Sequence, residues 1–313
     1  MKINFYWEFP YPDIESEILP PYYATTSHLH SAIQLFKICR EAYPDIEFTA
    51  IDSSKLNEKG ESGVKQYGPA DKFSHFYIII ENPDTKKYFT IAYWDKLRGM
   101  SEGTHWDLEN MVELFAGCGV QENEEDFRPA NINYTPISNM CLHITADQRI
   151  QQVWRTPKSI PNYLYFKGGD YDFRSHVYKD GRIKIDNDRV FQHEFIDMLA
   201  KDSIIIDING ASEISHRTFD AFGLSAALIR PKLTIKYHNE LIPDYHYAVL
   251  KCDDLGDWDR VIDAYLDRFE DLKKDPELVH FLAMNGRKWY EENATVKANA
   301  TLLKQLINFN KLI

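Results

Sequence analysis

The second half of the chain alternates short apolar runs with amphipathic segments. The apolar runs at residues 163–166, 204–208 and 226–229 have the length of buried strands. Residues 190–200 and 216–224 lie between them and have the length and mixed polarity of surface helices. Strands that alternate with helices are typical of a parallel sheet with crossover helices. The pattern therefore predicts an α/β fold for this half.

Three further helices are predicted at the end of the chain. The first has an apolar face that extends from Trp258 to Phe269, and the last contains Val296, Leu303 and Leu306. Between them, Asp275 and Pro276 form a strong start signal, a capping residue followed by proline at the first helical position. We expect this middle helix to bury four residues, namely Leu278, Phe281, Leu282 and Trp289.

The first half begins with a strand at residues 2–7, and a helix at 28–43 and a strand at 46–51 follow. Two aromatic and β-branched runs, 76–80 and 88–94, are separated by turn-forming residues and predict a hairpin. A domain boundary is expected between residues 148 and 161, where residues 155–161 are polar, contain two prolines and have the composition of a linker. We therefore expect two domains, residues 1–155 and residues 156–313.

Composition narrows the classes of protein that fit. The chain has 313 residues, of which 44% are hydrophobic, and its formal net charge is −12. A wholly acidic surface does not attract polyanions, so a general nucleic-acid binder is disfavoured. No apolar stretch approaches the ~20 residues of a membrane-spanning helix, and the first residues lack a signal-peptide core. We expect a cytoplasmic protein without a membrane span.

Residues 207–217 combine the features of an anion site. Within the predicted strand 204–208, the apolar residues Ile204–Ile206 are followed by Asp207. A polar loop containing Gly210 and Ser215 comes next, and His216 and Arg217 lie in the first turn of the following predicted helix. Backbone N–H groups at the start of a helix and a fixed guanidinium can face the same anion. A diphosphate is the ligand that suits such an arrangement best.

Three segments carry a resemblance to known enzymes: Tyr165–Gly169 with Arg174, Asp207–Arg217, and Leu241–Tyr247. As a set they resemble the nucleotide-sugar half of the GT-B glycosyltransferases. More narrowly, they are similar to the Rumi-type protein O-glucosyltransferases and the fungal capsule xylosyltransferases. The resemblance covers residues 160–300 in outline and does not extend into the first half.

The resemblance implies a GT-B fold, in which two Rossmann-like domains face each other across a cleft. Residues 1–155 would form the acceptor side, and residues 156–313 would bind the nucleotide sugar and carry the C-terminal helices. It further implies that the donor diphosphate contacts Arg174 and Arg217. The other donor-binding candidates are Gly168, Gly210, Ser215, His216 and His246.

The predicted activity is transfer of a sugar from a nucleotide sugar, expected to be UDP-linked, to an acceptor. Retaining GT-B enzymes often carry two glutamates eight positions apart; Glu213 fits the first, but Ala221 stands at the second, which favours inversion. An inverting enzyme needs a general base on the acceptor side. The candidates are Asp95, which follows an aromatic strand, and His28 and His30 at the first helix start.

No metal or other cofactor is expected, because arginine can neutralise the leaving diphosphate by itself. Two triplets, Asp170–Asp172 and Asp186–Asp188, match the D-x-D form that binds divalent metals in the other glycosyltransferase architecture. The acceptor stays open between a glycan, a lipid-linked sugar and modified DNA. One alternative is a phage enzyme that glycosylates hydroxymethylcytosine in DNA, in the host cytoplasm. Another is a non-catalytic module that binds nucleotides or glycans.

Overall fold

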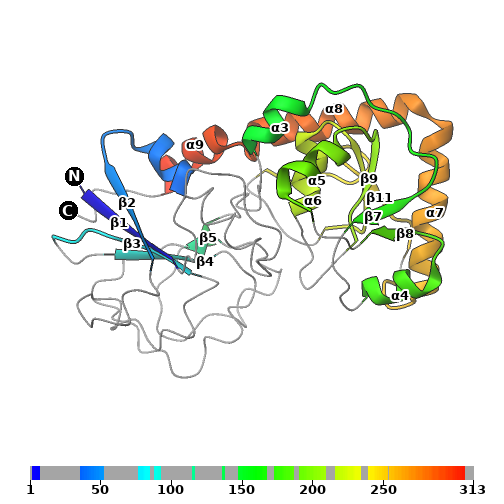
Figure 1. Cartoon of the computed structure of the whole chain (residues 1–313), viewed down its shortest axis with the longest axis horizontal. Helices are drawn as coiled ribbons and strands as arrows, with labels where there is room; N and C mark the ends of the chain where they lie inside the picture. The colour runs from blue at the N-terminus through cyan, green and yellow to red at the C-terminus, as the bar shows by residue number, and fades with distance from the viewer. Residues whose placement is uncertain are drawn as a thin grey trace.

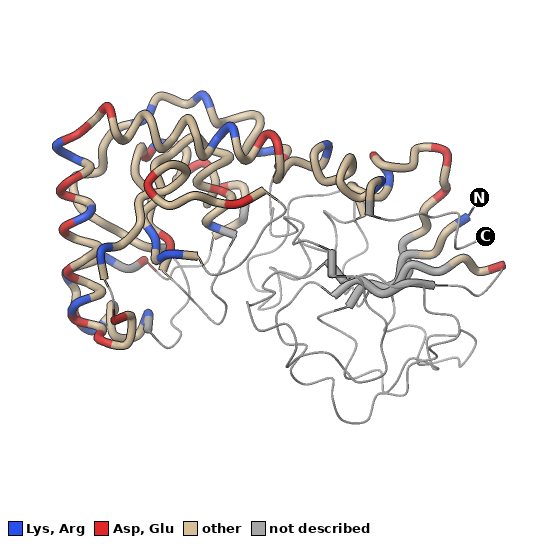
Figure 2. The backbone as a smooth tube through the Cα atoms, turned by 180° about the vertical axis from the view of Figure 1, so that it is seen from behind, with Lys and Arg blue, Asp and Glu red and all other residues tan. Residues whose placement is uncertain are grey.

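The computed structural model of the chain places its described elements in two groups (Figures 1 and 2). One group contains strands from the first half, and the other contains α3 (Asp147–Val153) and most of the later elements. The structure describes residues 2–7, 36–52, 77–84, 88–92, 115–116, 136–137, 147–167, 173–186, 190–208, 216–233, 239–252 and 254–306.

The first half contains a four-stranded sheet in the order β2-β1-β3-β4. Its central strand β1 is parallel to β2 and antiparallel to β3, and β3 and β4 form the predicted antiparallel hairpin. The strands are β1 (Lys2–Trp7), β2 (Glu47–Asp52), β3 (Tyr77–Glu81) and β4 (Tyr88–Ala92). Two short strands, β5 (Phe115–Ala116) and β6 (Pro136–Ile137), pair with each other. The predicted helix at 28–43 is seen over residues 36–42, and its earlier part lies outside the described residues.

The described part of the second half contains five short parallel strands. β7 pairs with β8, and β9, β10 and β11 form a three-stranded sheet. A parallel bridge between Ser159 and Asp202 joins the segment before β7 to the segment before β9. Across the fold the strands therefore follow the order β8-β7-β9-β10-β11. They are β7 (Tyr165–Lys167), β8 (Lys184–Asp186), β9 (Ile204–Ile206), β10 (Ala227–Arg230) and β11 (Ala248–Val249).

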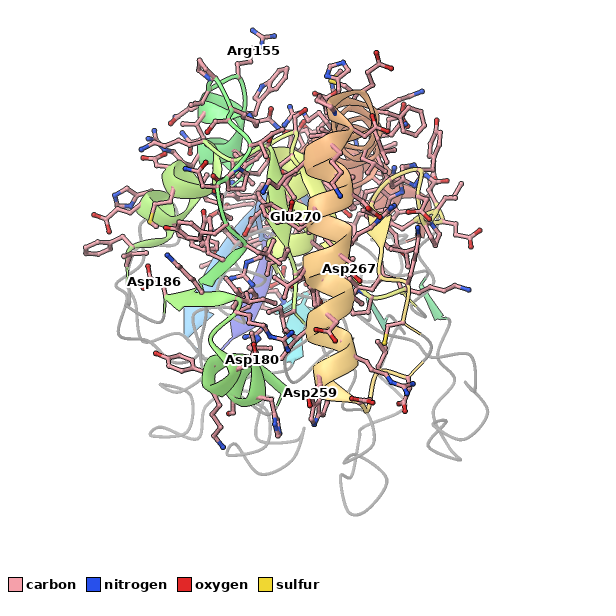
Figure 3. The ribbon with its side chains drawn as sticks, turned by 90° about the vertical axis from the view of Figure 1, so that its right-hand side faces the viewer. Arg155, Asp180, Asp186, Asp259, Asp267 and Glu270 are labelled. Atoms are coloured by element: carbon pink, nitrogen blue, oxygen red, sulfur yellow. The ribbon has the colours of Figure 1, made fainter. Side chains whose placement is uncertain are left out.

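Helices cover both faces of these strands. One face packs against α3, α5 (Gln192–Leu199), α6 (His216–Gly223) and part of α8 (Pro276–Asn293). The other face packs against α4 (Phe173–Asp180), α7 (Trp258–Lys274) and the start of α8. The acidic residues Asp259, Asp267 and Glu270 lie on the outer side of α7 (Figure 3).

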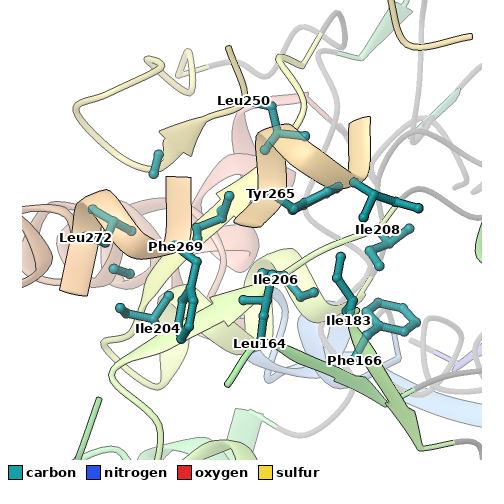
Figure 4. Packing of buried hydrophobic residues seen from close by; sticks show 14 of the residues in the cluster. Leu164, Phe166, Ile183, Ile204, Ile206, Ile208, Leu250, Tyr265, Phe269 and Leu272 are labelled. Carbon is teal, nitrogen blue, oxygen red and sulfur yellow. The ribbon is translucent and has the colours of Figure 1, made fainter. Parts of the chain in front are cut away.

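Alternation along the strands divides the hydrophobic core into two. In β9, Ile205 packs in the core that contains Phe219 and Trp289. Its neighbours Ile204 and Ile206 pack on the other side with Tyr265, as Figure 4 shows. Successive residues of a strand point to opposite faces, so a fully apolar strand such as β9 is buried on both sides. The predicted α/β alternation of the second half is confirmed, whereas the two-domain GT-B architecture stays a prediction.

The region in which the domain boundary is predicted, residues 148–161, begins inside a helix. Asp147–Val153 forms α3, which contacts α5 and α6 and places Ile150 in the second-half core. Trp154 follows and lies under the guanidinium of Arg287 at 4.4 Å. Apolar periodicity in this short segment was hidden by its many polar residues. The packing of the second half therefore includes α3.

The C-terminal helices confirm most of the pattern. The Asp275 carboxylate accepts a hydrogen bond from the Leu278 N–H at 2.9 Å and so caps α8 as predicted. Phe281, predicted to be buried, is 44% exposed. The last helix, α9 (Val296–Leu306), extends from α8 toward the first-half strands (Figures 1 and 2). None of the described helices is long and apolar enough to cross a bilayer.

Candidate functional site

The candidate site lies where β7 and β9 end. The chain leaves β7 for β8 on one side and returns from β8 to β9 on the other side of β7. In open α/β sheets such a reversal leaves a crevice at the carboxyl ends of the strands, where ligands bind. Phe166 is the middle residue of β7, next to its last residue Lys167, and Asp207 and Ile208 directly follow β9. The strand order therefore points to the same place as the sequence motif.

Arg217 lies in the first turn of α6 and is 9% exposed. Its guanidinium carbon is 3.9 Å from the centre of the Phe166 ring and 5.5 Å from that of Phe195 on α5. A guanidinium over an aromatic face is attracted by the ring's quadrupole, and its N–H donors then point along its own plane. Two aromatic rings therefore orient the donors of Arg217.

Burial also lowers the pKa of Arg217, because its positive charge is removed from water. Desolvation lowers its pKa to about 10, and the positive charge of Arg174 contributes in the same direction. The carboxylates of Asp207 and Asp220 act against this lowering. Arg217 nevertheless stays protonated at neutral pH, because its pKa remains well above 7. An anion bound next to two cations that are held away from water is strongly stabilised by their charges.

Arg174 reaches the same point from α4. Its Nη2 and Nε atoms donate to the carbonyl oxygen of Ile208 at 2.9 and 3.3 Å. Its guanidinium carbon lies 4.8 Å from the centre of the Phe166 ring. The two arginines predicted to bind a diphosphate thus come from different helices and converge on one aromatic ring. Arg174 also fixes the main chain where it leaves β9.

A buried polar network lies beneath the arginines. Asp207 Oδ2 accepts hydrogen bonds from Thr218 Oγ1 at 2.6 Å and from Arg230 Nη1 at 3.2 Å. Arg230 Nη1 also donates to Thr218 Oγ1 at 2.5 Å. All three residues are fully buried. The network joins the end of β9, the end of β10 and the first turn of α6.

The main chain at Asp207 is held from α7 as well. The hydroxyl of Tyr265 donates to the Asp207 carbonyl oxygen at 2.7 Å. Burial raises the pKa of Tyr265 well above its usual range, and the nearby Asp207 carboxylate raises it further, so the hydroxyl keeps its proton. Side chains from α4, α6, α7 and β10 therefore all act on residues 207–208. A segment with so many fixed partners is preorganised for binding.

Sequence reasoning did not select Phe166, Asp207, Thr218 or Arg230 as site residues. Two of them carried a usable signal, because Asp207 and Arg230 each end an apolar run. In an alternating α/β pattern, a charged residue in that position lies at the carboxyl edge of the sheet. Phe166 and Thr218 carried no comparable signal, since aromatic and hydroxyl side chains are common at such positions.

The structure does not bring His246 together with the arginines. It precedes β11, whose Ala248 pairs with Ile229, whereas the site lies beyond the carboxyl ends of the strands. Its Nδ1 atom accepts a hydrogen bond from the Ile242 N–H at 2.8 Å, and its ring meets Tyr245 edge-on. Desolvation lowers the pKa of His246. Its described contacts are those of a residue that stabilises the turn before β11.

Several predicted site residues lie outside the described residues. They are the three candidate bases, Asp95, His28 and His30, and the donor-binding candidates Gly168, Gly210 and Ser215. The backbone of His216 forms the first residue of α6, next to Arg217. The described part of the site therefore consists of Arg174, Arg217 and the residues that hold them in place.

Metal binding by the triplets Asp170–Asp172 and Asp186–Asp188 stays a hypothesis that the structure does not test. Asp186 is the last residue of β8. Of the other acidic residues in the two triplets, none belongs to the described part of the chain. Within that part, no group of three or more potential ligands is gathered at one point.

Comparison with models of known protein families gave no match to this chain. Comparison with curated proteins gave no significant match either. The resemblance to glycosyltransferases therefore rests on the motifs alone, and the site has to be interpreted from its geometry.

Proposed function

We propose that the protein is a glycosyltransferase whose second half binds the diphosphate of a nucleotide sugar, with a UDP-linked donor. The observation that carries the proposal is the convergence of Arg174 and Arg217 on the Phe166 ring. This point lies at the carboxyl ends of β7 and β9, beside the first turn of α6. It is the arrangement that the motif resemblance led us to expect for a donor diphosphate.

The chemistry of the reaction fits this support. Sugar transfer breaks the bond between the anomeric carbon and the phosphate oxygen, and a bond to the acceptor oxygen replaces it. Negative charge therefore grows on the departing nucleoside diphosphate. Permanent guanidinium charges that are held over an aromatic ring stabilise that charge without reorganisation. The acceptor would lose its proton to a base, for which Asp95, His28 and His30 remain the candidates.

Calorimetry with UDP tests the donor site. Arg217→Ala should weaken UDP binding by about 2–4 kcal/mol, the value of a lost charge-assisted contact to phosphate. Arg155→Ala is the matched control, because the Arg155 guanidinium also lies over an aromatic ring, that of Trp154, at 4.7 Å. In Figure 3 Arg155 lies at the top of the view, far from Asp186 at the carboxyl end of β8.

The control variant should bind UDP as the wild type does. A folded Arg217→Ala protein with unchanged UDP affinity would remove Arg217 from the donor site. Catalysis itself is tested by donor hydrolysis and transfer across a panel of nucleotide sugars. Affinity for UDP without turnover of any donor would instead identify a binding module that lacks catalysis.

A further inference from the structure

The two oxygens of Asp207 face different arginines. Oδ1 lies 3.9 Å from Nη1 of Arg217, the arginine of the candidate site. Oδ2 lies 3.2 Å from Nη1 of Arg230 and also accepts the Thr218 hydroxyl. One carboxylate thus stands between a site arginine and an arginine that is fully buried. Its negative charge is shared between the two.

The charges around Arg217 show why this sharing matters. Among the described side chains that act on Arg217, Arg174 is positive and Asp207 and Asp220 are negative. Arg174 and Arg217 together carry two positive charges, and the two aspartates carry two negative charges, so these four sum to zero. Arg230, paired with Asp207, brings the sum to plus one. A diphosphate binds where the sum of nearby charges is positive, and Arg230 supplies the one positive charge in excess.

Arg230 is not placed to touch a ligand. It is fully buried, its Nε atom donates to the carbonyl of Pro231 at 3.2 Å, and its Nη1 atom is used on Thr218 and Asp207. Any effect of Arg230 on binding must therefore pass through its neighbours. Among the described neighbours of Arg230, Asp207 also faces Arg217, so a path from Arg230 to the site runs through its carboxylate.

We propose that Arg230 is a positioning residue of the anion site, which neutralises Asp207 so that the charge of Arg217 acts on a bound diphosphate. This inference rests on the proposed function, since it assumes that the site takes a diphosphate. This role of Arg230 in charge balance differs from a purely structural role in one respect. A structural role requires the shape and hydrogen bonds of Arg230, whereas charge balance requires only that Asp207 be neutralised or absent.

Three variants separate the two roles, with UDP and inorganic pyrophosphate as calorimetric probes. Arg230→Met keeps the length of the side chain but lowers the local sum of charges from plus one to zero. The double variant Asp207→Asn/Arg230→Met restores it to plus one, from Arg174, Arg217 and Asp220. Arg230→Lys keeps the positive charge. Thermal melts and near-ultraviolet circular dichroism establish that each variant is folded.

Arg230→Met should bind both probes at least about 10-fold more weakly, because truncating one member of a buried pair leaves the other charge uncompensated. The double variant should recover to within about 3-fold of the wild type, since replacing both members of a buried ion pair can be nearly neutral. Arg230→Lys should also stay within about 3-fold, as it still neutralises Asp207. Recovery by a second substitution is a readout that a structural role would not produce.

The outcomes that overturn the inference are distinct from those that overturn the function. If the wild type binds UDP but the folded double variant is as weak as Arg230→Met, charge balance is not the role of Arg230. Unchanged affinity in Arg230→Met has the same meaning. If Arg230→Met does not fold, the double variant decides alone, and its failure to fold counts against charge balance. A wild-type protein that binds neither probe overturns the proposed function together with this inference.

Discussion

Arg217 and His246 show how burial changes what a titratable side chain can do. Desolvation lowers the pKa of both residues. The ordinary pKa of arginine is so high that Arg217 remains a cation at neutral pH even after this lowering, and it can bind an anion. The ordinary pKa of histidine is close to neutral pH, so burial favours the neutral form of His246, in which Nδ1 accepts a hydrogen bond from the Ile242 N–H. The same physical effect thus leaves Arg217 charged at neutral pH and favours the neutral form of His246.

The neutral state of His246 predicts a pH dependence of folding. The unfolded chain binds a proton at a pKa of about 6.5, and the folded protein binds it only at lower pH. Stability is therefore complete above about pH 6.5 and falls below it, by about 1.4 kcal/mol for each pH unit between the two pKa values. We expect His246→Asn, whose Oδ1 can replace Nδ1 as acceptor, to lose less stability between pH 7.5 and 5.5.

Urea unfolding at the two pH values measures this difference. His280→Asn is the control, because His280 is exposed on α8, and it should behave as the wild type does. Equal pH dependence in His246→Asn and the wild type would show that His246 does not control acid sensitivity. UDP affinity should be the same in His246→Asn, since the residue lies away from the arginines.

At the scale of elements, two glycines set how closely α6 and α8 approach. A Cβ atom on Gly286 of α8 would lie 2.7 Å from Cδ1 of Phe222 and 3.1 Å from the His246 carbonyl oxygen. A Cβ atom on Gly223, at the end of α6, would lie 3.0 Å from Cε2 of Tyr290 on α8 and 2.8 Å from Cγ2 of Ile150 on α3. Both helices pack where a side chain would not fit. This contact holds α6, and with it Arg217, against the sheet.

Gly286→Ala should therefore destabilise the protein, although alanine favours helix by about 1 kcal/mol over glycine. The clash with a buried ring and a backbone oxygen costs about 1–3 kcal/mol, so we expect a net loss of up to about 2 kcal/mol in the free energy of unfolding. Lys288→Ala, at an exposed position of the same helix, should change it by less than about 0.5 kcal/mol. A Gly286→Ala protein more stable than the wild type would contradict the close packing.

At the scale of the whole molecule, charge is distributed unevenly. The chain carries a formal net charge of −12, and both signs are spread along the second-half helices (Figure 2). The candidate site nevertheless gathers Arg174, Arg217 and Arg230 at one point. Most of the acidic excess therefore lies elsewhere on the molecule. A ligand with concentrated negative charge is better suited to this point than an extended polyanion.

Binding at such a point should stabilise the fold. UDP at 100 times its dissociation constant should raise the unfolding free energy of the second half by about 2.7 kcal/mol. We expect the same gain in excess EDTA, because arginines neutralise the diphosphate in the proposed site. Thermal melts with and without chelator measure it, and uridine, which lacks phosphate, is the control ligand. Stabilisation that requires added manganese would assign the diphosphate to a bound metal.

The sequence by itself determined the features that depend on local pattern. The alternation of strands and helices after residue 160 and the start of α8 at Asp275 follow from periodicity and capping, which act over a few residues. The sequence also selected Arg174 and Arg217, because each stands in a motif. It could not decide that Phe281 is exposed, since periodicity defines an apolar face but not what covers it.

Only the tertiary structure decided how these residues meet. Arg174 and Arg217 share the Phe166 ring because β7 lies next to β9, and strand order is a property of the whole sheet. The pairing of Arg230 with Asp207 joins residues 23 positions apart through the register of β9 and β10. His246, selected by its motif, is separated from the arginines for the same reason. Contacts between distant segments depend on which strands are neighbours, and no local pattern encodes that order.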